Sequence, residues 1–225
     1  PWADATGGSV VRVVLDHPCK LNAMSRAMWR QLRSVFESLQ RAPDARCIVI
    51  EGAGDAFCAG GDISEYENFR FAPDTLAAFH EDEVWAGLNA MLLCDVPIVA
   101  VIRGACMGAG VEIASCCDIR IAADNAKFGA PIAKLGFPMA PKDAALVTSQ
   151  IGSLKARQML LEAAVFGAAD MQASGFLSRV QPVADLDSHV ASTAERIARL
   201  APQAARLNKQ TLRALAAGDV AAPAL

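Results

Sequence analysis

The sequence lacks an excess of positive charge, a cluster of histidines and an apolar run long enough to cross a membrane. Its 225 residues carry 21 Lys and Arg against 24 Asp and Glu, so electrostatic binding of nucleic acid is not indicated. The longest apolar segment is interrupted by Asp95, Arg103, Glu112 and Asp118, which argues against a membrane-spanning helix. The three histidines lie far apart, and no Cys or His spacing resembles a zinc site. We therefore expect this chain to bind neither nucleic acid, nor a membrane, nor a metal.

A disulfide framework is not indicated either. The seven cysteines are an odd number. Most of them lie inside apolar segments, namely Cys47, Cys94, Cys106, Cys116 and Cys117. Buried, reduced thiols are typical of a cytosolic protein, so we expect a cytoplasmic location. The N-terminal residues show no signal-peptide pattern, although Pro1 leaves the natural start open.

The order of apolar patterns predicts an α/β protein. Hydrophobic residues make up 53% and charged residues 20% of the chain, which is typical of a globular domain with a large core. The expected strands are 10–15, 46–51, 98–102, 118–122 and 177–180, and the expected helices are 26–41, 80–93, 111–117, 143–151, 154–163, 170–175, 185–200 and 202–216. Strands that alternate with helices predict right-handed crossovers. We expect a core over 1–152 and a mostly helical region over 153–225.

Two local patterns refine this prediction. Ser25 directly precedes the helical pattern at 26–41 and is a suitable N-cap. Residues 63–79 show no clear period and mix aromatic with charged side chains. A segment of that kind beside a glycine turn is typical of a mobile loop that shapes a pocket. We therefore expect a loop there.

Two turns rich in small residues are the most informative feature. Phe-Cys-Ala-Gly-Gly-Asp at 57–62 follows the apolar segment 48–52, and the glycine-rich segment 104–112 follows 98–102. Small residues let a backbone turn sharply and let a ligand approach closely. Two turns that aim one peptide N–H each into the same cleft can hold a carbonyl oxygen while negative charge develops on it. An oxyanion hole is the hypothesis.

Several blocks in this order resemble the crotonase superfamily, also called the enoyl-CoA hydratase/isomerase superfamily. The blocks are Asp-His-Pro at 16–18, Asn-Ala-Met at 22–24, the two glycine turns, Cys-Asp-Ile-Arg-Ile-Ala at 117–122, Phe-Gly-Ala-Pro at 128–131, Leu-Gly at 135–136 and a last block at 173–180. The resemblance covers roughly residues 8–215. Any single turn is weak evidence, but the blocks together are specific.

The resemblance implies a spiral of ββα units followed by a C-terminal helical region used in trimer assembly, often as a dimer of trimers. The core would bind an acyl-CoA thioester and stabilise its enolate oxygen between two backbone N–H groups. By motif position these belong to Gly61 and Ala109, where the family more often has glycine at the second position. Coenzyme A enters as part of the substrate, so no permanently bound cofactor is expected. The family also carries one or two further C-terminal helices, so we expect the natural chain to continue.

The resemblance further implies which residues lie around the coenzyme A adenine and phosphates. These residues are Lys20, Asn22, Ala23, Ala59, Gly60, Asp62 and Ile63. Lys20 is a reasonable phosphate partner because a flexible cation suits a phosphate at a surface mouth. The acyl chain would run toward residues 63–79.

The acid–base residues match the family only in part. Glu112 corresponds to one of the two catalytic glutamates of the hydratases, and it can act as general base or acid. Ile132 stands where the second glutamate would follow Phe-Gly-x-Pro, and isoleucine can neither activate water nor carry a proton. We therefore expect poor hydration of simple crotonyl-CoA. Lys142, Asp143 or His80 could replace the missing group, although charge near a helix start or plain surface exposure explains them equally well.

Two functions remain open from the sequence. One is an acyl-CoA-processing enzyme with a specialised reaction, such as isomerisation, decarboxylation or hydration coupled to C–C cleavage. The other is a non-catalytic family member that binds acyl-CoA or serves as an assembly partner.

Overall fold

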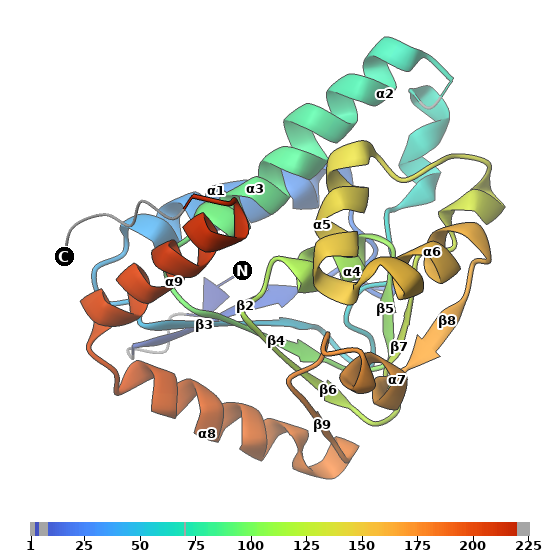
Figure 1. The fold of residues 1–225 in the computed structure, drawn as a ribbon. Coiled ribbons are helices and arrows are strands. Elements are labelled where there is room, and N and C mark those ends of the chain that lie inside the picture. The colour runs from blue at the N-terminus through green and yellow to red at the C-terminus, as the bar shows by residue number, and fades with distance from the viewer. Residues whose placement is uncertain (1–2, 5–8, 70, 220–225) are drawn as a thin grey trace.

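The computed structural model describes residues 3–4, 9–69 and 71–219, and its centre is a six-stranded sheet (Figure 1). The strands, in spatial order, are β1 (Ala3–Asp4), β2 (Val10–Leu15), β3 (Cys47–Gly52), β4 (Ile98–Ile102), β6 (Ile119–Ala123) and β9 (Arg179–Gln181). All neighbouring pairs from β2 to β9 are parallel, and β1 is antiparallel to β2. Parallel neighbours need long crossover connections, which the helices supply.

Both faces of this sheet are buried, which explains its uninterrupted apolar strands. Side chains alternate between the faces. Ile48 and Ile98 belong to the larger core, and Val49 and Val99 to a second core. The second core is completed by α8 (Leu186–Ala198), which covers the lower face of the sheet in Figure 1.

A second, smaller sheet produces the repeating unit of the fold. It contains β5 (Ala105–Met107), β7 (Lys127–Gly129) and β8 (Val165–Gly167). Isolated bridges extend it from Cys106 to Cys58 and pair Gly61 with Met24. Strands β2, β3, β4 and β6 are therefore each followed by a short segment of the second layer and then by a helix. This strand–strand–helix spiral confirms the predicted crotonase-like α/β fold.

The helices lie largely where their patterns predicted. They are α1 (Arg26–Arg41), α4 (Ala109–Ser115), α5 (Pro141–Ile151), α6 (Ser153–Leu161), α7 (Ala168–Ala173), α8 and α9 (Pro202–Ala216). The Ser25 hydroxyl accepts a hydrogen bond from the Met28 N–H at 3.2 Å, so the predicted N-cap is confirmed. Pro141 and Pro202 occupy the first helical positions, where a missing N–H costs nothing.

The loop predicted for residues 63–79 is wrong, because most of this segment is helical. A 3₁₀ helix spans Ile63–Asn68, and α2 (Pro73–Phe79) continues through a π-helical turn at His80–Trp85 into α3 (Ala86–Leu93). The expected helix 80–93 therefore starts seven residues earlier, at Pro73. The wide π turn shifts the side-chain faces between α2 and α3, so no single helical period runs through the segment.

Polar contacts attach the C-terminal helix α9 to the core. Asp95 follows α3, and its carboxylate accepts hydrogen bonds from Gln40 at 2.8 Å, from Gln210 at 2.7 Å and from Arg213 at 2.8 Å. Lys209 pairs with Asp118 at 2.7 Å. None of the residues of α9 is fully buried. Within the described residues, no helix is both long enough and apolar enough to span a membrane.

Candidate active site

A small cavity of about 60 Å³ lies where the turn after β3, the start of α4, α1, the π-helical turn and the start of α5 meet. It is lined by Trp29, Gly61, Ile63, Tyr66, His80, Val84, Ala109, Glu112, Ile132, Leu135, Phe137, Pro138, Met139, Ala140 and Asp143. The cavity brings together all three residues that the sequence analysis placed in the chemistry: Gly61, Ala109 and Glu112.

The bridge to Met24 sets the direction of the Gly61 peptide. Met24 bonds to the neighbours of Gly61, with its N–H to the Gly60 oxygen at 2.8 Å and its oxygen to the Asp62 N–H at 2.9 Å. In this parallel pairing the N–H of Gly61 itself points away from Met24. A Cβ at Gly61 would lie 2.4 Å from the Tyr66 hydroxyl. A larger residue at 61 would therefore need the Tyr66 ring or the main chain to move.

The second amide belongs to the first residue of α4. The N–H groups of a first helical turn have no intrahelical acceptor, so the Ala109 N–H is available to a ligand. The turn into this helix is made by Gly108, with a φ of 47°. Ala109 is not among the described residues with positive φ. Alanine is therefore compatible with this position, where the family more often has glycine.

Two carboxylic acids share the cavity. Glu112 is 6% exposed and Asp143 only 2% exposed. Burial raises the pKa of Glu112, and the charge of Asp143 raises it further. The pKa of Asp143 is raised as well, first by burial and then by the charge of Glu81. Buried acids of this kind hold protons at higher pH than exposed ones, which suits groups that exchange a proton with a substrate.

Two of the three candidate replacements for the missing glutamate line the cavity, and the third lies outside it. Asp143 and His80 line the cavity, with His80 Nδ1 3.8 Å from Asp143 Oδ2. Burial lowers the pKa of His80, which favours the neutral imidazole. The Lys142 ammonium group instead pairs with Glu81 in solvent and is not part of the cavity wall.

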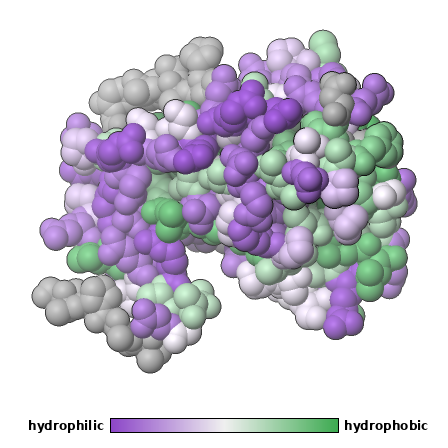
Figure 2. All heavy atoms as spheres, turned by 90° about the horizontal axis from the view of Figure 1, so that it is seen from above, coloured by the Kyte–Doolittle hydropathy of each residue, from purple (hydrophilic) through white to green (hydrophobic). Residues whose placement is uncertain are grey.

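Ile132 lines the cavity and also an adjoining apolar groove of about 560 Å³. The groove is formed by Ile132, Ala133, Gly136, Phe137, Pro138, Met139, Ala144, Leu160 and Leu161. In Figure 2 hydrophobic residues gather on the right-hand side of the molecule, the side on which Figure 1 places α5 and α6. An aliphatic side chain at 132 thus joins the polar cavity to an apolar surface.

At the predicted binding region for coenzyme A, the Lys20 ammonium group pairs with the Asp62 carboxylate. Lys20 Nζ donates to Asp62 at 3.2 Å and to the Ser64 hydroxyl at 3.0 Å. Burial pushes the pKa of Asp62 upward, but its bonds to Ser64 and Lys20 outweigh burial and hold that pKa below its ordinary value. Ile63 is half exposed and lines the cavity, so it lies between mouth and cavity.

The other predicted mouth residues fix the backbone. The Asn22 side chain accepts from the His17 N–H at 3.2 Å and donates to the oxygens of Ala53 and Ala56 at 2.9 and 2.8 Å. The Ala59 N–H donates to the oxygen of Leu21 at 2.9 Å. The oxygen of Ala23 accepts from His17 Nδ1 at 2.6 Å, and Gly60 has a φ of 120°. Because these hydrogen bonds use the Asn22 side chain, only its main chain is available for a contact with coenzyme A.

The sequence analysis did not single out Trp29, which the structure places in the cavity wall. Trp29 is almost completely buried on α1, in the apolar stripe with Leu32 and Phe36. By spacing alone it belongs to the core. The signal available in the sequence is the tryptophan itself, because its side chain carries an N–H donor that needs a partner when it is buried.

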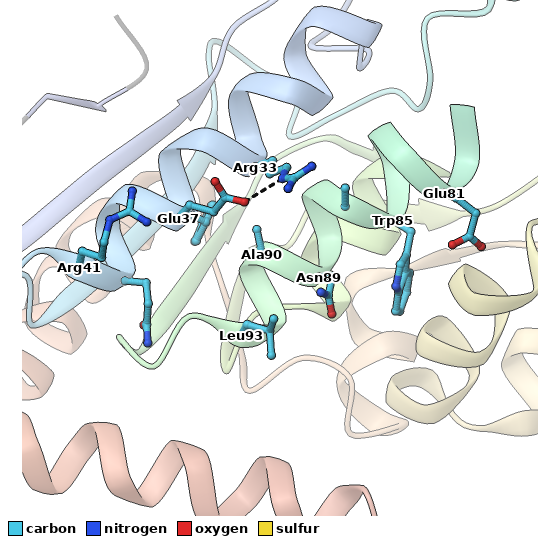
Figure 3. A pocket seen from close by; sticks show the side chains of 11 residues that line it. Arg33, Glu37, Arg41, Glu81, Trp85, Asn89, Ala90 and Leu93 are labelled. Carbon is cyan, nitrogen blue, oxygen red and sulfur yellow. Dashed lines mark hydrogen bonds and ion pairs between the residues drawn. The ribbon is translucent and has the colours of Figure 1, made fainter. Parts of the chain in front are cut away.

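A separate groove lies between α1 and α3 (Figure 3). Arg33 and Glu37 pair across one turn of α1 at 2.8 Å, and Trp85, Asn89 and Leu93 form the opposite wall. It contains none of the predicted site residues. Within the described residues, no group of three or more His, Cys, Asp or Glu side chains is arranged to hold a metal ion.

The α/β spiral, with Gly61, Ala109 and Glu112 lining one cavity, is the arrangement expected of a crotonase-type enzyme. The family model "Enoyl-CoA hydratase/isomerase" matches residues 5–222, and the chain belongs to this family. A probable enoyl-CoA hydratase of Mycobacterium tuberculosis is 35% identical over 200 residues, which cover 89% of this chain and 76% of the relative.

Solved structures agree with this assignment. An enoyl-CoA hydratase/carnithine racemase from Magnetospirillum magneticum is 34% identical with a TM-score of 0.89, covering 92% of this chain and 78% of its own. A putative enoyl-CoA hydratase/isomerase family protein from Hyphomonas neptunium has a TM-score of 0.90 at 28% identity, covering 96% and 82%.

Proposed function

We propose that this enzyme forms the enolate of an acyl-CoA thioester, with the oxygen held by the N–H groups of Gly61 and Ala109 and the proton carried by Glu112. The observation that supports this proposal is the convergence of these three residues on one buried cavity. Lys20 lies at the mouth, where it can leave Asp62 for a coenzyme A phosphate.

The chemistry follows from the positions of these groups. The Glu112 carboxylate removes a proton from the carbon next to the thioester carbonyl. The C–H electron pair forms a C=C bond to the carbonyl carbon, and the π pair of the C=O bond moves to the oxygen. The two amides then donate to an oxygen that carries more negative charge than in the substrate. A preorganised donor of this kind lowers a barrier by about 3–4 kcal/mol. The proton returns from Glu112 to the same or another carbon.

Asp143 is the best candidate for the second proton carrier. It is the other carboxylic acid of the cavity wall, and it comes from α5 rather than from the position of Ile132. The changed position supports a specialised reaction (isomerisation, decarboxylation, or hydration coupled to C–C cleavage) rather than efficient hydration of crotonyl-CoA.

The second candidate is a family member that binds acyl-CoA without converting it, and Ile132 at the cavity wall is the observation that favours it. A panel of acyl-CoA thioesters with mass-spectrometric product analysis separates the two functions. We expect turnover of at least one thioester and slow hydration of crotonyl-CoA. Binding without any turnover would favour the second candidate, and fast crotonyl-CoA hydration would refute the role given to Ile132.

The assembly expected from the family is a homotrimer or a dimer of trimers, with 153–225 contributing to the contacts. Exposed Leu154 and Leu161 on α6 and Leu212 and Leu215 on α9 support an interface there. Sedimentation equilibrium should give three or six times the chain mass, and a monomer would contradict this assembly.

A further inference from the structure

Asp143, the proposed second proton carrier, is almost completely buried. Its Oδ1 atom has no hydrogen-bond partner among the residues that the structure describes. An acid that leaves its proton on the product must recover a proton from solvent before the next turnover. A bound acyl group in a cavity of about 60 Å³ leaves little room for the water that would supply this proton. The acid therefore needs a side chain that connects it with solvent.

His80 is placed to make this connection. Its Nδ1 atom is buried, has no hydrogen-bond partner within the described part of the chain, and lies 3.8 Å from Asp143 Oδ2. Part of the same side chain reaches solvent, because 23% of it is exposed. The separation is longer than a hydrogen bond, but catalytic hydrogen bonds often shorten only when the substrate binds. The ring thus lies between the buried acid and the surface.

The fold holds the π-helical turn of His80 against α1. Glu83, in the same turn, is buried and accepts hydrogen bonds from Arg26 Nε at 3.0 Å and from Arg30 at 3.0 Å. Such a carboxylate resists displacement, because the loss of its partners would leave an uncompensated buried charge. Turns of π-helix are rare and occur frequently at functional sites. The turn is therefore a fixed feature, and it brings His80 to the cavity wall.

The same turn also meets the start of α5. The Glu81 carboxylate pairs with the Lys142 ammonium group at the surface, directly beside the contact of His80 with Asp143. The Phe79 ring packs edge-on against the imidazole, with the ring centres 5.3 Å apart. Consecutive residues of the two elements thus lie together, and the imidazole has neighbours that fix its orientation.

An imidazole ring suits the transfer of protons because its two nitrogens are separate sites. In the neutral ring one nitrogen donates and the other accepts, and burial lowers the pKa of His80 in favour of this neutral form. The Nδ1–H group gives its proton to the Asp143 carboxylate, and Nε2 takes a proton from an acid in solvent. The ring then carries its proton on Nε2 and returns to the first tautomer by exchange with solvent.

We propose that His80 relays protons between Asp143 and solvent in each turnover. His80 acts through Asp143 and is not itself a catalytic residue. The inference rests on the proposed function, because it takes Asp143 to be the second proton carrier for an acyl-CoA thioester. It deepens that function by giving the buried acid a route to solvent.

The test uses His80→Gln, which keeps a polar side chain but cannot carry a proton. Steady-state rates are measured with the full chain and its best thioester, in buffers of increasing imidazole concentration at constant pH and ionic strength. In dilute imidazole we expect kcat to be about tenfold or more below wild type, with KM nearly unchanged. Concentrated imidazole should restore kcat of the variant and leave wild type unaffected. A purely structural defect would not respond to the buffer.

Two further variants make the result specific. His189→Gln is the matched control, since His189 is exposed on α8 and bonds only to its own helix at the Asp185 oxygen; its kcat should equal that of wild type at every imidazole concentration. In an Asp143→Asn background, His80→Gln should lower kcat no further, because a relay works only through the acid that it serves.

Three outcomes would overturn the relay. They are an unchanged kcat in His80→Gln, a loss that imidazole does not restore, and an additional loss in the Asp143→Asn background. If no thioester is converted by the wild-type protein, the proposed function fails and the relay fails with it. If thioesters are converted and His80→Gln keeps full activity, only the relay fails.

Discussion

The proposed reaction uses the charge of the Glu112 carboxylate. The Glu112 side chain also fills space in a buried part of the fold. Glu112→Gln keeps the volume and removes the base. We expect kcat on the best thioester to fall by about 10²–10⁴-fold, the usual contribution of a positioned general base. Binding of the thioester should change little, as measured by calorimetry. An unchanged kcat would remove Glu112 from the mechanism.

The contact between Gly61 and Tyr66 allows a test of the first amide. Gly61→Ala places a Cβ 2.4 Å from the Tyr66 hydroxyl, so the buried Tyr66 ring or the main chain that carries the amide must shift, and either shift alters the cavity at this amide. We expect kcat/KM to fall by about 10²-fold or more, as when an oxyanion donor is lost. Steady-state kinetics on the best thioester measures it.

Two variants make this test specific. In the double variant Gly61→Ala/Tyr66→Phe the nearest ring carbon is 3.2 Å from the new Cβ, a contact that a small shift relieves, so activity should partly return. Ala109→Gly keeps its N–H and should stay within about threefold of wild type. A double variant as inactive as Gly61→Ala alone would contradict the steric explanation.

At the scale of elements, the Asp95 carboxylate is one of the polar groups that hold α9 on the core. Asp95→Ala removes the common acceptor of Gln40, Gln210 and Arg213. We expect the free energy of unfolding to fall by about 2–4 kcal/mol, because donors at a largely buried site lose their partner. Urea denaturation measures this change. Glu195→Ala, which removes an exposed pair with Arg199 on α8, is the control and should cost less than about 0.5 kcal/mol.

Elements with a regular period could be predicted from the sequence, and those without one could not. Residues 26–41 and 202–216 were predicted with the bounds that the structure has, because a cap residue or a proline marks each start. Strands β5, β7 and β8 were not predicted, since β5 lies inside the glycine-rich segment 104–112 and β7 and β8 each end in a glycine. The π turn disrupted the period of the helix from Pro73 to Leu93. Pro73 itself was the available signal that a helix begins there.

The residues of the candidate site also differ in whether the sequence could predict them. Gly61, Ala109 and Glu112 could be predicted because they belong to continuous motifs. Asp143 and His80 could be named from the sequence only as possible replacements. Trp29 is 114 positions from Asp143 in the chain, and only the folded arrangement of α1, the π turn and α5 brings both to one cavity. Such a juxtaposition leaves no local pattern.

At the scale of the whole molecule, the two buried acids make stability depend on pH. The fold raises the pKa of Glu112 and of Asp143, first through burial. A raised pKa means that the folded state holds its protons more tightly than the unfolded chain. Below the ordinary pKa of these acids, both are protonated in the folded and the unfolded state and cost the fold nothing. As pH rises through their raised folded-state pKa values, the free energy of unfolding falls.

Neutral substitutes should remove this dependence. We expect Glu112→Gln and Asp143→Asn to be more stable than wild type at about pH 9, by about 1.4 kcal/mol for each unit of pKa shift removed. The difference should largely disappear at about pH 3, below the ordinary pKa of both acids, where both are mostly protonated in either state. Thermal unfolding at several pH values gives the comparison. Equal wild-type and variant curves at high pH would contradict the raised pKa values.

The amide of Ala109 is a main-chain group, and this has a consequence for how the protein can change over evolutionary time. Any substitution there except proline keeps an N–H at that point of the backbone. The surrounding walls are side chains, such as Ile132, and a single codon change can replace them. A lineage can therefore exchange one thioester reaction for another by altering its walls, without passing through an ancestor that has lost this amide donor. Directed evolution of new reactions should for the same reason randomise the walls and leave the turns alone.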